Sequence, residues 1–76
     1  MQDKGNRVAV GRRISAIRSE RGLSQEELAE ASGVARAQIS RYESGQTMPS
    51  ATNGVRLAKA LDCPLDVLYA LVPITK

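Results

Sequence analysis

Apolar residues recur along the chain at intervals of three and four positions, the spacing of one face of an α-helix. The first such stripe consists of Val10, Ile14 and Ile17, and it predicts a helix over about residues 7–21 with Gly22 as its stop signal. No segment shows the alternation of apolar and polar residues that is typical of a β-strand. The pattern therefore predicts an all-α fold.

The second predicted helix has the clearest start in the sequence. In the segment LSQEEL (23–28), the Ser24 side chain can accept a hydrogen bond from the backbone of Glu27, and the Glu27 carboxylate can accept one from the backbone of Ser24. This reciprocal pair is a capping box. The helix is expected to end before Gly33, because glycine readily adopts the left-handed conformation that closes a helix.

Three further helices complete the prediction. The third covers about residues 36–44 and ends at Gly45, and the few residues before it force a sharp angle with the second helix. The fourth begins after Ser50, a suitable cap, and the fifth covers residues 65–71. A mobile N-terminus (1–6) and a tail (72–76) are expected on either side of a single domain spanning residues 7–71.

The fourth helix is expected to bury an apolar stripe, yet it contains one residue that does not favour a helix. Its apolar positions are Val55, Leu57, Ala58 and Leu61. Gly54 should lower helix stability by up to about 1 kcal/mol relative to alanine. Close packing of a neighbouring side chain against Gly54 would account for its presence.

Composition excludes several classes of protein. With no histidine and one cysteine, Cys63, the chain lacks the usual general base, the ligands for a structural zinc ion and the second half of a disulfide. We therefore expect no enzymatic activity, no cofactor and no metal. No apolar run approaches the roughly 18 residues of a membrane-spanning helix, and the charged start resembles no signal peptide. A cytoplasmic protein that does not bind membranes is expected.

The predicted third helix has a low outer face. At about 100° per residue, Ile39 and Tyr42 fall on the inner side, with Val34 and Ala35 near them. The outer arc holds, in order, Arg36, Ser40, Ser44, Ala37 and Arg41. Because the side chains between the two arginines are short, such a helix can enter a DNA major groove, which is about 12 Å wide. A solvent-exposed face with two incidental charges fits these residues equally well.

The segment LSQEELAEASGVARAQISRYESG (23–45) resembles the helix-turn-helix of the phage repressor and Cro-type regulators, the XRE family. Residues 49–71 resemble the family's fourth and fifth helices, so the resemblance covers most of the chain. It implies a compact five-helix, lambda-repressor-like domain with its helix-turn-helix at 24–44, which binds double-stranded operator DNA. Two departures concern helix ends: Ala35 replaces the usual capping residue, and Ser32 replaces a commonly apolar one.

The resemblance also implies roles for individual residues. The base-contacting positions would be Arg36, Ala37 and Arg41, with Gln38 and Ser40 as secondary candidates. Phosphate contacts would come from Gln25, Ser44, Gln46 and Thr47, with Arg12 and Arg13 adding positive charge. Arg18 and Glu43 would form a partly buried ion pair that orients the recognition helix and reads no bases.

The C-terminal segment carries more apolar residues than so small a domain is expected to cover, which is typical of an interface. The expected dimer interface comprises Leu65, Leu68, Tyr69, Leu71, Val72 and Ile74. A two-fold dimer would present two recognition helices to half-sites one DNA turn apart, about 34–36 Å. Alternatively, these residues only seal the underside of the domain.

Taken together, these features predict a homodimeric, sequence-specific repressor. The alternative is an antitoxin-type module whose main task is to bind a protein partner, with DNA contact secondary. That function would need an additional binding segment, for which the sequence offers only residues 71–76.

Overall fold

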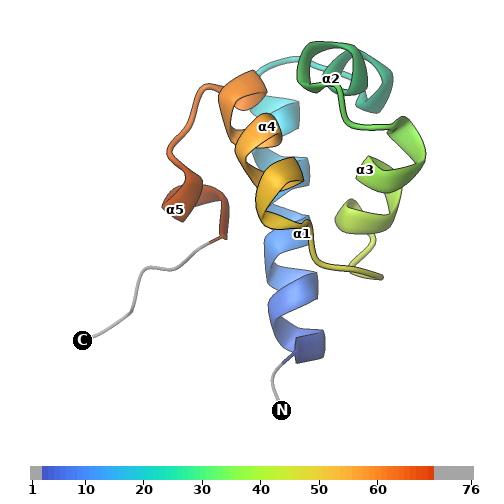
Figure 1. Ribbon diagram of the computed structural model, residues 1–76, viewed down its shortest axis with the longest axis vertical. Helices are drawn as coiled ribbons and strands as arrows, with labels where there is room; N and C mark the ends of the chain where they lie inside the picture. The colour runs from blue at the N-terminus through green and yellow to red at the C-terminus, as the bar shows by residue number, and fades with distance from the viewer. Residues whose placement is uncertain (1–2, 70–76) are drawn as a thin grey trace.

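Five helices make up the computed structural model, which describes residues 3–69 (Figure 1). They are α1 (Asp3–Glu20), α2 (Gln25–Ser32), α3 (Arg36–Glu43), α4 (Ala51–Leu61) and α5 (Leu65–Tyr69). Over these 67 residues (3–69) the secondary structure contains helices, turns and bends and no strand. The predicted all-α, five-helix architecture is confirmed.

Helix α1 begins earlier than the apolar pattern indicated. Its first residue is Asp3, so positions 3–6, which we expected in a mobile N-terminus, are helical. None of these four residues is apolar, and a pattern of buried positions therefore could not detect the added turn. The other end agrees with the prediction: the helix stops at Glu20, and Gly22 follows with a positive φ of 73°.

A single apolar core joins all five helices. Its buried members are Val10, Ile14, Leu28, Val34, Ile39, Tyr42, Leu57, Ala58, Leu61 and Leu68. Helix α1 packs against α3 on one side and α5 on the other, while α2 packs against both α3 and α4 (Figure 1). The predicted inner positions are confirmed except for two: Val55 is 42% exposed and Ala35 lies on the surface.

Helices α1 and α3 approach each other so closely that only glycine fits at one position. A Cβ atom on Gly11 would overlap the carbonyl oxygen of Tyr42 and lie 3.1 Å from that of Glu43. One turn earlier, a Cβ atom on Gly45, which takes a positive φ of 81° just after α3, would lie 2.9 Å from Val8 Cγ2. These contacts fix the C-terminal end of α3 against the N-terminal half of α1.

An ion pair joins the same end of α3, at Glu43, to Arg18 in the last turn of α1. Arg18 donates from Nε to Glu43 Oε2 at 2.7 Å and from Nη2 to Oε1 at 3.0 Å. Its Nη1 donates to the carbonyl of Leu23 at 2.7 Å, and Gln25 Nε2 donates to Glu43 Oε1 at 3.0 Å. The hydrogen bond to Glu43 raises the pKa of Arg18 above its usual value. The pair thus ties α1, the start of α2 and α3 together.

Gly54 is explained by the side chain of Tyr69. A Cβ atom at position 54 would overlap the Tyr69 hydroxyl and lie 2.9 Å from the ring carbon that carries it. The hydroxyl donates to the carbonyls of Pro49 and Ser50, each at 3.2 Å, at the start of α4. The absence of a side chain at position 54 therefore lets α5 dock onto α4, as close packing at this glycine would require.

The Gly54→Ala substitution should lower the free energy of unfolding by about 1–2 kcal/mol, because overpacking against Tyr69 outweighs the better helix propensity of alanine. In a Tyr69→Ala background the clash is gone, and the same change should instead stabilise by up to about 1 kcal/mol. Urea unfolding of the four proteins measures both effects. The same sign in both backgrounds would contradict this packing.

Replacing either partner of the ion pair should destabilise the fold by about 3 kcal/mol, because the remaining charge stays partly buried without its partner. The side chains of Arg18 and Glu43 are only 17% and 8% exposed. The double substitution Arg18→Met with Glu43→Met should cost less than either single change. Urea unfolding tests this, with Arg13→Met, an exposed residue of the same helix, as a control that changes stability by less than about 0.5 kcal/mol.

Candidate nucleic-acid interface

Helices α2 and α3 are joined by a three-residue turn over positions 33–35. Gly33 takes the left-handed conformation (φ 79°) and donates its N–H to the carbonyl of Ala29. Val34 is buried and returns the chain to the core. The Ser32 hydroxyl accepts a hydrogen bond from the N–H of Val34 at 3.1 Å, so this departure from the family pattern stabilises the turn. The two short helices therefore have a fixed crossing.

The starts of α2 and α3 agree with the prediction from the sequence. In the capping box of α2, the N–H of Glu27 donates to Ser24 Oγ at 3.0 Å, and the N–H of Ser24 donates to Glu27 Oε1 at 2.8 Å. Helix α3 begins after Ala35 without any side-chain cap, as its sequence requires. The position of α3 therefore depends on packing and on the Arg18–Glu43 pair more than on its own N-terminus.

The exposed side of α3 is the low face that the sequence predicted. Its exposed members, which we call the α3 outer face, are Arg36, Ala37, Ser40, Arg41 and Ser44. Gln38 is half-buried at its edge, while Ile39 and Tyr42 on the opposite side are buried. In Figure 1, α3 forms one side of the molecule, and α1 runs beside it through the middle. The outer face is thus directed away from the core.

Gln25 has a second task beside the phosphate contact expected of it. Its side chain is half-buried and donates one amide hydrogen to Glu43. A glutamine amide has two hydrogens, so one remains for a phosphate oxygen. The residue stands at the first position of α2, where the backbone N–H groups of a helix favour an anion.

The loop after α3 carries the other predicted phosphate contacts. Ser44 and Gln46 are exposed and Thr47 is half-buried. Ser44 Oγ donates to the carbonyl of Arg41 at 3.1 Å, which fixes the end of the helix. The predicted residues of α2, α3 and this loop are therefore accessible, except where Gln25, Gln38 and Thr47 are partly covered.

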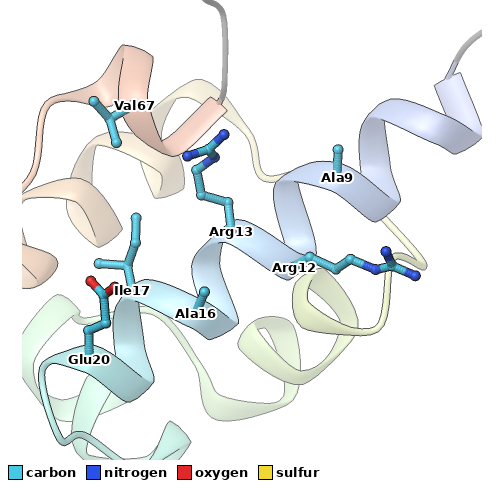
Figure 2. Close-up of a pocket in the computed structure, with 7 residues that line it drawn as sticks. All are labelled: Ala9, Arg12, Arg13, Ala16, Ile17, Glu20 and Val67. Carbon is cyan, nitrogen blue, oxygen red and sulfur yellow. The ribbon is translucent and has the colours of Figure 1, made fainter.

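Arg13 does not lie with these residues, whereas the side chain of Arg12 points away from α5 and its expected phosphate contact stays a prediction (Figure 2). Both line an open groove of about 550 Å³ on the outside of α1, together with Val67 from α5. Figure 2 shows Arg13 pointing toward α5. The face of α1 that meets α3 instead carries Gly11 and Arg18. Adjacent positions on a helix point about 100° apart, so a run of arginines in sequence did not reveal which of them face α3.

The expected dimer interface needs correction where the structure describes it. Leu68 is fully buried in the core and is not available to an interface, whereas Tyr69 is half-buried against Gly54 and its interface role stays a prediction. Leu65 is 37% exposed, as an interface residue would be. Leu71, Val72 and Ile74 lie outside the described residues. Val55 on α4, an exposed apolar residue that we had expected to be buried, is an additional candidate.

Other chemistry is sparse in the part of the chain that the structure describes. Over residues 3–69, no group of three or more His, Cys, Asp or Glu side chains is arranged to hold a metal ion. Burial raises the pKa of the Cys63 thiol and of the Tyr69 hydroxyl, which keeps both groups protonated. None of the five helices is long and apolar enough to cross a membrane.

Sequence comparison finds a family match over most of the chain. The model of the helix-turn-helix family matches residues 14–68. A putative HTH-type transcriptional regulatory protein of Pyrococcus horikoshii is 39% identical over 64 residues, which cover 79% of this chain and 20% of the relative. The HTH-type transcriptional regulator PuuR of Escherichia coli is 34% identical over 70 residues, covering 92% of this chain and 37% of PuuR. The chain therefore spans only a fifth to two fifths of these relatives.

Solved structures agree with this match. The restriction-modification controller protein C.AhdI from Aeromonas hydrophila superposes with a TM-score of 0.81 at 39% identity, covering 84% of this chain and 97% of C.AhdI. A transcriptional regulator from Vibrio cholerae gives a TM-score of 0.83 at 23% identity, covering 91% of this chain and 39% of that chain, and shares the fold. The chain belongs to the helix-turn-helix family of DNA-binding transcriptional regulators.

Proposed function

We propose that the protein regulates transcription by binding an operator sequence with α3 inserted in the major groove. The observation that carries this proposal is the α3 outer face, on which exposed arginines flank alanine and serine side chains. Bulky residues at these positions would hold the helix away from the base edges, whereas short ones let it enter. A regulator bound in this way blocks access of the transcription machinery to the operator, so repression is the expected outcome in the cytoplasm.

Arg36 and Arg41 are the residues assigned to reading bases. A guanidinium group presents paired N–H donors that match O6 and N7 of guanine, and each good pair discriminates by about 1–3 kcal/mol. Ala37 and Ser40 lie between them and would contact base edges at close range. Gln38 is half-buried and remains a secondary candidate.

The residues on either side of α3 are assigned to the DNA backbone. Gln25 at the start of α2 would bind one phosphate, and Ser44, Gln46 and Thr47 would bind phosphates on the other side of the groove. Such contacts set the position of the protein on the duplex without reading sequence. Arg13 is left out of this interface because its side chain points toward α5, whereas Arg12 keeps its expected role of adding positive charge (Figure 2).

A homodimer is proposed to bind two half-sites. Support comes from Leu65 and Val55, which are exposed apolar residues on helices that pack against each other, α5 and α4. The predicted contributions of Leu71, Val72 and Ile74 belong to the same proposal. Two-fold symmetry is the commonest arrangement of such oligomers and matches a palindromic operator. The relatives are named as transcriptional regulators, which favours this function over the antitoxin-type alternative.

Arg41→Ala should flatten the preference among DNA sequences, whereas Gln25→Ala should weaken binding to all duplexes alike. A bound sequence is first selected from a random duplex pool, and affinities are then measured for it and for single-base variants. The loss of discrimination at the position read by Arg41 should be about 1–3 kcal/mol. Arg13→Ala serves as the matched control and should leave both affinity and preference unchanged. Equal behaviour of the Arg41 and Arg13 variants would remove the basis of the proposal.

Leu65→Glu should shift the protein from dimer to monomer in sedimentation at micromolar concentration, because a charge would replace an apolar contact of the interface. Val67→Glu is the matched control: it is also an exposed apolar residue of α5, 38% exposed, but it lines the groove beside α1. This control should remain dimeric. A wild-type protein that stays monomeric under these conditions would exclude the dimer.

A further inference from the structure

The loop assigned to the DNA backbone has no charge of its own. Residues 44–50 read SGQTMPS, without lysine or arginine. Backbone binding depends largely on cationic side chains, which neutralise phosphates and release counterions. A loop of neutral residues would make hydrogen bonds to phosphates but would lack this electrostatic attraction. A cation brought from another part of the fold would supply it.

Arg7 of α1 lies at this loop. Its Nε donates to the carbonyl oxygen of Gly45 at 3.3 Å, although the two residues are 38 positions apart. The next residue, Val8, lies so close to Gly45 that a Cβ atom there would be 2.9 Å from Val8 Cγ2, and Gly11 lets α1 approach the end of α3. Figure 1 shows the loop after α3 running beside the N-terminal half of α1. The guanidinium group is therefore anchored next to Gln46, the neighbour of Gly45.

We propose that Arg7 binds a DNA phosphate beside the loop that follows α3, as a residue of the interface contributed by α1. This assignment rests on the proposed function and extends it. A guanidinium group has five N–H donors, and the bond to Gly45 uses one of them. The half-buried position and the carbonyl anchor restrict the side chain before DNA arrives, which lowers the entropy lost on binding.

The other arginines of α1 are not fixed at this loop. Arg18 is paired with Glu43, Arg13 points toward α5, and Arg12 is an exposed side chain without the anchor that holds Arg7 (Figure 2). Among the arginines of α1, Arg7 is the one hydrogen-bonded to the loop after α3.

The test is the salt dependence of binding to the selected duplex. Arg7→Gln should reduce the slope of log affinity against log salt concentration by about 1, as one phosphate contact is lost. Affinity at low salt should fall about tenfold for cognate and base-substituted duplexes alike. Arg7→Lys keeps the charge but not the fork of donors, and it should restore most of the slope. Arg13→Gln removes an equal charge from the same helix and should leave the slope unchanged.

The outcomes separate a phosphate contact from a purely structural role. If Arg7 only holds α1 against the loop, Arg7→Gln lowers thermal stability and affinity while the salt slope stays that of the wild type, and the assignment is overturned. A reduced slope that Arg7→Lys does not restore would also contradict a role through charge. Failure of the wild-type protein to bind any duplex is a different result, because it would overturn the proposed function itself.

Discussion

Glu43 is the residue through which the three helices nearest the proposed interface are held in one arrangement. Its carboxylate accepts two hydrogen bonds from Arg18 of α1 and one from Gln25 of α2, while its own backbone belongs to α3. A side chain that is 8% exposed and ionised is tolerated only when such donors surround it. Because neither α2 nor α3 exceeds 8 residues, helix propensity alone would not hold either of them. The direction of the α3 outer face therefore depends on this carboxylate.

Two glycines complete the constraint by removing side chains where helices meet. Gly11 brings α1 against the carbonyl groups at the end of α3, and Gly54 admits the ring of Tyr69 between α4 and α5. Tyr69 then donates to the carbonyls of Pro49 and Ser50, so α5 also fixes the loop that leads into α4. Short helices in a small domain each bury little apolar surface. Close approach of the helices at these two glycines therefore contributes stability that longer helices would gain from a larger buried surface.

The sequence was sufficient for features set by local patterns. Apolar spacing located the five helices, and the capping box at Ser24 and the low outer face of α3 followed from neighbouring residues. It was not sufficient where a contact joins distant positions. Nothing near Gly11 in the sequence indicates that a carbonyl group of α3 lies against it. Leu68 was expected at an interface, but the position of α5 buries it in the core. The first turn of α1 was not predicted because residues 3–6 include no apolar side chain, and the helix had been located by the spacing of apolar residues.

The net charge of +3 does not locate the interface, because arginines have different roles in different parts of the fold. Arg18 and Arg21 donate to acceptors within the domain, Arg21 by closing the end of α4 through the carbonyl of Leu61 at 2.7 Å. Arg36 and Arg41 are exposed on α3. A guanidinium group whose donors are taken up by acceptors within the domain, as in Arg18, stabilises the fold and is not available to DNA. One that keeps free N–H donors remains available, whether it is exposed on α3 or, like Arg7, held beside the loop by a single bond. The capacity of this domain to bind DNA thus depends on which arginines keep free donors, and the helix crossings fixed at Gly11 and Glu43 decide where those arginines lie.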